Sequence, residues 1–95
     1  MMNFYDNLIL LRLQEAYRAS GDSKTNFWQK QQDGLMVSTV KCGTRGAGVF
    51  KHEIDSISLA RAAGYTDEQL RELVKRLEQK RAELLHNILS QLDAA

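Results

Sequence analysis

Residues 20–30 have the sequence SGDSKTNFWQK, in which turn-forming residues are followed by polar and aromatic ones. Gly21 adopts positive φ values at no steric cost, so it favours a tight turn at this point. Asp22 or Ser23 can then cap a helix, because a side-chain oxygen accepts a hydrogen bond from a backbone N–H of the first turn. The pattern therefore predicts a turn followed by a short polar helix.

The side chains that follow the turn are of the kinds that contact DNA. Ammonium, hydroxyl and amide groups bind phosphate oxygens and read base edges in the major groove. We expect Phe27 and Trp28 to anchor the helix inward, and for Trp28 a contact on the phosphate side stays open as a second role. An ordinary surface helix is the alternative for this segment taken alone. The expected DNA contacts in the segment are Ser23, Lys24, Thr25, Asn26, Trp28, Gln29 and Lys30.

The composition fits one globular domain of 95 residues, with 43% apolar and 26% charged residues. No apolar run approaches the roughly 20 residues that span a bilayer, and residues 8–11 lack the flanks of an export signal. Cys42 is the one cysteine, which fits a reducing compartment without internal disulfides. We therefore expect a cytoplasmic, nucleoid-associated protein with no membrane partner.

Charge is distributed unevenly along the chain. Residues 12–52 hold seven basic and three acidic residues, whereas residues 53–95 hold six basic and eight acidic residues. A basic segment attracts polyanions such as nucleic acids. The first part of the chain is therefore the expected binding region for DNA.

Apolar periodicity, turn residues and capping signals predict four helices. The last helix begins at a capping box, in which Thr66 is the cap and Gln69 follows three residues later. Gly64 is the expected end of the helix before it. The first helix is expected to end at residues 19–21 and the others to span residues 23–32, 52–63 and 67–92, while residues 1–11 are a short strand or the start of the first helix.

Residues 35–40 are rich in β-branched side chains and predict a strand, for which residues 49–51 would be the return strand. The glycine-rich segment between them would be the tip of a hairpin, or wing. Gly46 and Gly48 would let the backbone approach DNA closely, and an arginine in a wing reaches a phosphate or the minor groove. For Arg45 an exposed loop arginine is the alternative. The expected DNA contacts of the wing are Lys41, Thr44 and Arg45.

The predicted C-terminal helix carries a stripe of apolar residues. We expect Leu70, Leu73 and Leu77 to cover the core of the small domain. Lys80 and Arg81 interrupt the stripe, and beyond them it extends past the domain. Self-association is therefore expected through Leu84, Leu85, Ile88, Leu89 and Leu92. The same stripe supports an alternative function, a protein-interaction module that acts through its C-terminal amphipathic helix.

The expected fold is mainly α with a small β-hairpin wing. Residues 1–64 would form a winged helix-turn-helix DNA-binding domain, and residues 65–95 a long amphipathic helix that packs on it. Catalytic patterns are weak, because His52, His86 and Cys42 lack the spacing of a metal site or of a nucleophile and its base. We therefore expect no enzyme activity, no cofactor and no metal.

Five short segments follow one another in a characteristic order between residues 11 and 57. They are Leu-Arg-Leu-x-Glu-Ala at 11–16, Gly-x-Ser-Lys-Thr-Asn-Phe-Trp at 21–28, Asp-Gly at 33–34, Val-Lys-x-Gly-x-Arg-x-Ala-Gly at 40–48 and Glu-Ile-Asp at 53–55. In order and spacing this region resembles the AlpA-type prophage regulators and the related small excisionases. The chain departs from the family's pattern at Asp22, Gln31 and Val49, where the family has leucine, an apolar residue and tryptophan.

The resemblance implies a MerR-like winged helix-turn-helix that binds specific double-stranded DNA of a prophage or integrative element. It also implies a transcriptional regulator, an excisionase, or both, since an excisionase binds beside the attachment site, bends the DNA and directs recombination towards excision. The expected partners are double-stranded DNA, a second copy of the chain and an integrase.

Overall fold

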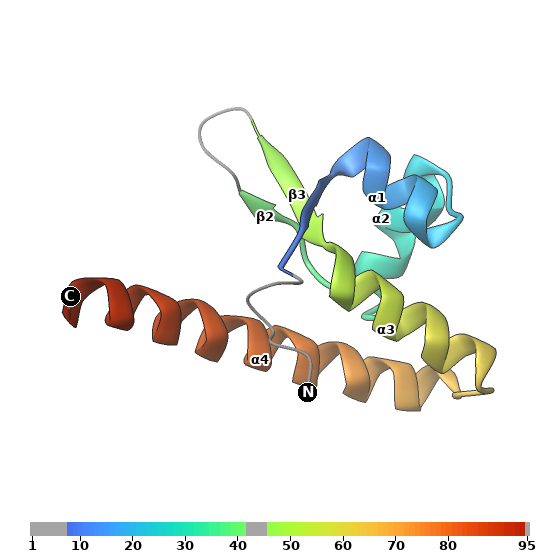
Figure 1. Ribbon diagram of the computed structural model, residues 1–95. Coiled ribbons are helices and arrows are strands. Elements are labelled where there is room, and N and C mark those ends of the chain that lie inside the picture. The colour runs from blue at the N-terminus through green and yellow to red at the C-terminus, as the bar shows by residue number, and fades with distance from the viewer. Residues whose placement is uncertain (1–7, 42–45, 95) are drawn as a thin grey trace.

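The protein is mainly helical with a small sheet, in a computed structural model that describes residues 8–41 and 46–94 (Figure 1). The elements in chain order are β1 (Leu10–Arg12), α1 (Leu13–Ser20), α2 (Lys24–Gln32), β2 (Val40–Lys41), β3 (Ala47–Phe50), α3 (Lys51–Ala62) and α4 (Asp67–Ala94). The strands form one antiparallel sheet in the order β1-β3-β2. The coarse prediction of a mainly α fold with a small hairpin and a long C-terminal helix is confirmed.

The turn between α1 and α2 has the predicted local structure. Gly21 has a φ of 75°, and its backbone N–H donates to the carbonyl oxygen of Arg18. Ser23 caps α2, because its hydroxyl oxygen accepts a hydrogen bond of 3.1 Å from the backbone N–H of Asn26. Asp22 has a different role and accepts a hydrogen bond of 2.7 Å from Nζ of Lys30. The serine, rather than the aspartate, therefore fixes the start of α2.

The strand predicted over residues 35–40 is wrong for most of its length, since only Val40 of this range belongs to β2. Met36 and Val37 are both buried, so the segment turns into the core instead of alternating between two faces. Its polar groups bind side chains: the Gln31 amide donates to the carbonyl oxygen of Val37, and the backbone N–H of Ser38 donates to Glu78. The return strand also starts earlier than predicted, at residue 47, and Lys51 opens α3.

Gly48 has a structural role in the packing of the strands, besides the predicted approach of its backbone to DNA. It lies opposite Arg12 of β1 and Val40 of β2. A Cβ atom at this position would overlap the backbone carbonyl oxygen of Leu11. The glycine therefore allows β1 to pack closely on β3, and the approach of its backbone to DNA stays a prediction.

The core gathers side chains from both halves of the chain, including Phe27 of α2, Ile54 of α3 and Leu70 of α4. Leu73 and Leu77 pack against this core, as predicted. Trp28 is 55% exposed, so the prediction of a second inward anchor is wrong. Successive residues of an α-helix differ in direction by about 100°, so that Phe27 turns inward and Trp28 turns to the side.

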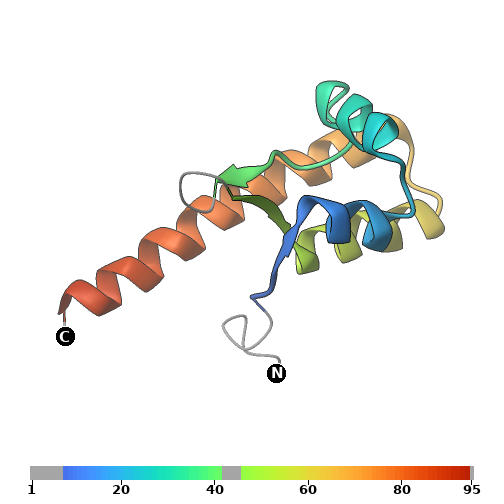
Figure 2. The same ribbon diagram turned by 90° about the horizontal axis from the view of Figure 1, so that it is seen from above.

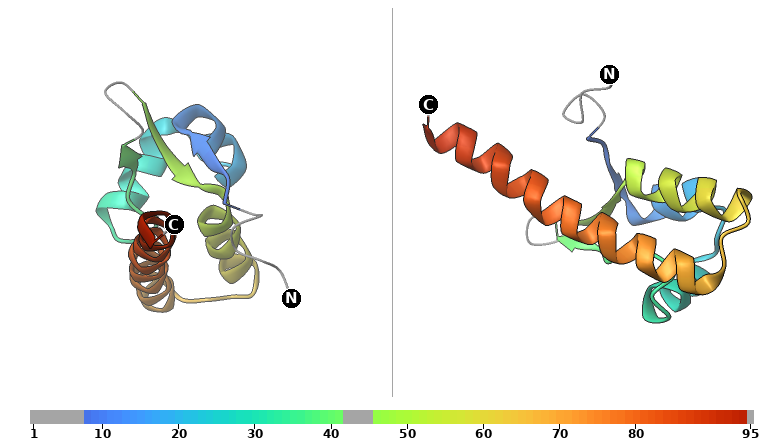
Figure 3. Two further views of the ribbon diagram at one scale, coloured as in Figure 1. Left: turned by 60° about the vertical axis from the view of Figure 1, so that its left-hand side comes forward. Right: turned by 90° about the horizontal axis from the view of Figure 1, so that it is seen from below.

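The last two helices lie beside each other and are joined at Gly64, which has a φ of 90° (Figure 3). The predicted capping box starts α4: the backbone N–H of Thr66 donates to the Gln69 side chain, and the backbone N–H of Gln69 donates to the Thr66 hydroxyl. The C-terminal part of α4 extends beyond the other elements (Figure 2). Among the described residues, no helix combines the length and the apolarity needed to cross a bilayer.

Candidate nucleic-acid interface

The outward face of α2 carries polar side chains opposite a single buried anchor. Phe27 is 1% exposed, and it meets the ring of Tyr17 edge-on with the ring centroids 5.1 Å apart. With about 3.6 residues per turn, Thr25, Gln29 and Gln32 project from the side of α2 that faces away from Phe27. All three are exposed. This face presents one hydroxyl and two amide groups, which are donors and acceptors suited to base edges.

Gln32 completes this face, although it is not among the residues predicted to contact DNA. It lies two helical turns after Thr25 and one turn after Gln29, so helical spacing was the signal that could have identified it. The two flanks of α2 carry the other predicted contacts. Asn26 and Lys30 lie on one flank, and Lys24 and Trp28 lie on the other.

Several predicted contacts already have partners within the protein. The Lys30 ammonium lies 2.7 Å from Oδ1 of Asp22, and the two side chains are 26% and 10% exposed. Gln29 Nε2 donates to Oδ1 of Asp33 over 3.2 Å at the end of α2. The Ser23 hydroxyl caps the helix. Lys24, Thr25 and Asn26 are exposed at the start of α2, where they are accessible to a ligand.

The wing residues predicted to contact DNA are only partly described by the structure. Lys41 ends β2 and is exposed. Thr44 and Arg45 lie outside the described residues, as does Cys42. The sheet joins the hairpin to β1, because β3 pairs with β1 on one side and with β2 on the other.

A buried ion pair holds the segment that leads into β2. Glu53 is fully buried, and its carboxylate accepts hydrogen bonds from Nη2 of Arg81 at 2.6 Å and from Nε at 3.0 Å. The same guanidinium donates to the backbone carbonyl oxygen of Ser38 at 3.1 Å. Glu78 accepts a hydrogen bond of 3.1 Å from the backbone N–H of Ser38. Two side chains of α4 therefore fix the base of the hairpin.

Arg71 links α4 to the end of α2. Its Nε donates a hydrogen bond of 2.9 Å to the backbone carbonyl oxygen of Asp33, the residue that caps α2 at its C-terminus. A cation at this end of a helix interacts favourably with the helix dipole. The position of α2 and the base of the hairpin thus both depend on contacts with α4.

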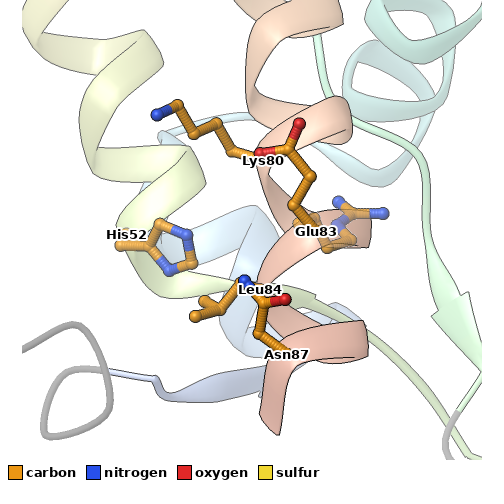
Figure 4. Close-up of a pocket in the computed structure, with 6 residues that line it drawn as sticks. His52, Lys80, Glu83, Leu84 and Asn87 are labelled. Atoms are coloured by element: carbon orange, nitrogen blue, oxygen red, sulfur yellow. The ribbon is translucent and has the colours of Figure 1, made fainter. Parts of the chain in front are cut away.

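A groove of about 190 Å³ lies between the start of α3 and the middle of α4. In Figure 4 the His52 ring on α3 faces Leu84 and Asn87 on α4, with Lys80 and Glu83 at its rim. The Phe50 ring lies against His52, with centroids 5.8 Å apart. The described side chains that line the groove include one imidazole and charged groups of both signs. No serine or cysteine that could act as a nucleophile is among them. Among the described residues, no His, Cys, Asp and Glu side chains group as metal ligands.

The apolar stripe predicted to mediate self-association divides into two parts in the structure. Leu84, Leu85 and Ile88 are half-buried, whereas Leu89 and Leu92 are 60% and 68% exposed.

Comparisons of the chain with protein-family models, with curated proteins and with solved structures found no match. The geometry of α2, the hairpin and α4 therefore carries the functional interpretation.

Proposed function

We propose that this protein binds specific sequences of double-stranded DNA through α2. In this proposal α1 and α2 are the two helices of a winged helix-turn-helix, α2 enters the major groove, and the β2–β3 hairpin is the wing. The observation that carries it is the outward face of α2, where exposed Thr25, Gln29 and Gln32 stand opposite the buried Phe27. The proposed role is binding rather than catalysis.

The resemblance of residues 11–57 to AlpA-type regulators and small excisionases supports a narrower role. We infer that the protein serves a prophage or integrative element as a transcriptional regulator, as an excisionase, or as both. An excisionase role would add an integrase as a partner on the same DNA. Footprinting on the DNA upstream of an integrase gene and beside an attachment site would separate the two roles.

The proposal is tested by selecting a duplex from a random library and then measuring its affinity as a function of salt concentration. Lys24→Ala removes one exposed cation at the start of α2. We expect the slope of log affinity against log salt to fall in magnitude by about one unit, as for one lost phosphate contact. Gln29→Ala should relax the base preference at one position of the selected site.

Lys80→Ala is the matched control, because this lysine lies at the groove between α3 and α4 and not on α2. The control should keep the slope of the unaltered protein. If the unaltered protein selects no sequence and shows no salt-dependent duplex binding, the proposed function is wrong.

A second candidate function follows from the exposed leucines near the end of α4. Leu89 and Leu92 extend an apolar stripe into solvent, and exposed apolar stripes of this kind mark interaction sites. The occupant that we infer is a second copy of the chain.

A further inference from the structure

A groove of about 520 Å³ runs between α1, α2 and the segment that leads into β2. Its walls include Leu13 and Tyr17 of α1, Lys24 and Trp28 of α2, and Thr39. Lys24 is the one charged residue of the lining, so the groove combines apolar walls with a positive rim. It lies along the flank of α2 and reaches the outward face at Thr25, which also lines it.

We propose that this groove binds a sugar–phosphate segment of one strand of duplex DNA, an inference that rests on the proposed function. An α-helix with its side chains is about 10–12 Å wide, and the major groove of B-DNA is about 12 Å wide. A helix that fills the groove therefore presents each of its flanks to one strand of the backbone. The flank that carries Trp28 is open to a ligand along the groove.

The groove offers apolar surface to the sugar and polar hydrogens to the phosphate. The exposed indole of Trp28 and the side chain of Leu13 provide the apolar surface. Tyr17 lines the groove, and its ring is held by the edge contact with Phe27. Hydroxyl groups of tyrosine and threonine are common phosphate ligands.

The hydroxyl oxygen of Thr39 accepts a hydrogen bond from within the protein, and its hydroxyl hydrogen can be donated to a ligand. The Gln31 side-chain amide donates a hydrogen bond of 3.0 Å to the Thr39 hydroxyl oxygen. A hydroxyl group that accepts one bond still has a proton to donate. The Gln31 amide also donates to the carbonyl oxygen of Val37, so this glutamine fixes the wall of the groove.

The opposite flank of α2 is less suited to a phosphate. There the Lys30 ammonium is paired with the Asp22 carboxylate at 2.7 Å, which places a negative charge beside the cation. The lining of the Trp28 groove contains no carboxylate. Charge therefore favours a polyanion on the Trp28 flank.

Trp28 is the only tryptophan of the chain, so its fluorescence reports directly on the groove. The experiment titrates the protein with a fluorescently labelled duplex selected by binding and follows two signals. Anisotropy of the label measures complex formation, and acrylamide quenching of Trp28 measures access to the indole. We expect the quenching constant to fall severalfold as the complex forms.

The two signals separate failure of this inference from failure of the proposed function. Complex formation that leaves Trp28 as accessible as in the free protein overturns the groove assignment and leaves DNA binding intact. The groove would then fit an apolar protein segment instead. An absence of complex formation overturns both proposals.

A variant pair tests the hydroxyl group of the wall. Tyr17→Phe keeps the ring against Phe27 and removes only the hydroxyl, and we expect affinity to fall about tenfold for all sequences alike, because a hydrogen bond to a charged group is lost. Tyr65→Phe is the matched control, since Tyr65 lies between α3 and α4 and is 47% exposed. Equal affinities of the two variants would contradict the assignment of Tyr17 to the binding wall.

Discussion

At the scale of single residues, the contact between Glu53 and Arg81 joins α3 to α4. Glu53 is fully buried at the start of α3, and the Arg81 side chain from α4 is 11% exposed. The guanidinium also lies 5.8 Å from the centroid of the Phe50 ring. A buried carboxylate requires a partner, because burial of an unpaired charge is strongly unfavourable.

Arg81→Met should therefore destabilise the protein strongly. It leaves the Glu53 carboxylate buried without its cation, and loss of one partner from a buried pair costs about 3–5 kcal/mol. The free energy of unfolding from urea denaturation measures this effect. The double variant Glu53→Leu/Arg81→Met should recover part of the loss, since it removes both charges.

The control for this prediction is the exposed pair between Lys51 and Asp55, which is 2.7 Å long against 2.6 Å for the buried pair and whose side chains are 47% and 49% exposed. Lys51→Met should change the free energy of unfolding by less than about 1 kcal/mol, as for other surface pairs. Similar losses in Arg81→Met and Lys51→Met would show that the buried pair has no special weight.

At the scale of elements, the approach of β1 to β3 depends on Gly48. Gly48→Ala places a methyl group against the Leu11 carbonyl oxygen, which belongs to the backbone and has little freedom to move. Overpacking of this kind costs about 1–3 kcal/mol. Urea denaturation should show this loss, whereas Ala47→Gly in the same strand should cost only about 0.5–1 kcal/mol, the general penalty of a glycine. An unchanged stability of Gly48→Ala would refute the proposed close contact.

Elements defined by local signals could be predicted from the sequence. Gly21 and Ser23 act within one turn of the chain, and the Thr66–Gln69 capping box acts within one turn of α4. Residues 35–39 could not be predicted in this way. Their β-branched side chains favour a strand, but their polar groups bind Gln31 and Glu78, and Glu78 is 40 residues away from Ser38.

The residue types of the candidate site could be predicted from the sequence, whereas their arrangement in space could be predicted only in part. The polar character of α2 follows directly from its sequence, whereas the sideways direction of Trp28 depends on which residue reaches the core. Tyr17 and Thr39 flank Trp28 only because the chain folds back on α2. The role of Arg81 could not be predicted either, because its partner Glu53 is 28 residues away. The interruption of an apolar stripe by a charged residue does not identify that partner.

At the scale of the whole molecule, α4 has two different parts. The part up to Arg81 contributes Leu70 and Val74 to the core and fixes α2 and the hairpin through Arg71, Glu78 and Arg81. Its C-terminal end extends beyond the rest of the protein (Figure 2). Stable interfaces usually bury about 1,200–2,000 Å² in total, which is more than a short stripe of leucines on each partner provides.

We therefore expect weak self-association that strengthens when two copies bind adjacent sites on one DNA, because the shared duplex raises their effective concentration. The double variant Leu89→Gln/Leu92→Gln should abolish the concentration-dependent dimer in sedimentation velocity while the stability stays unchanged, since both side chains are exposed. Leu59→Gln is the matched control, because Leu59 is an equally exposed leucine on α3, at 71%. A protein that sediments as a monomer at high micromolar concentration, and that binds paired sites without cooperativity, would exclude a second copy as the partner of this surface.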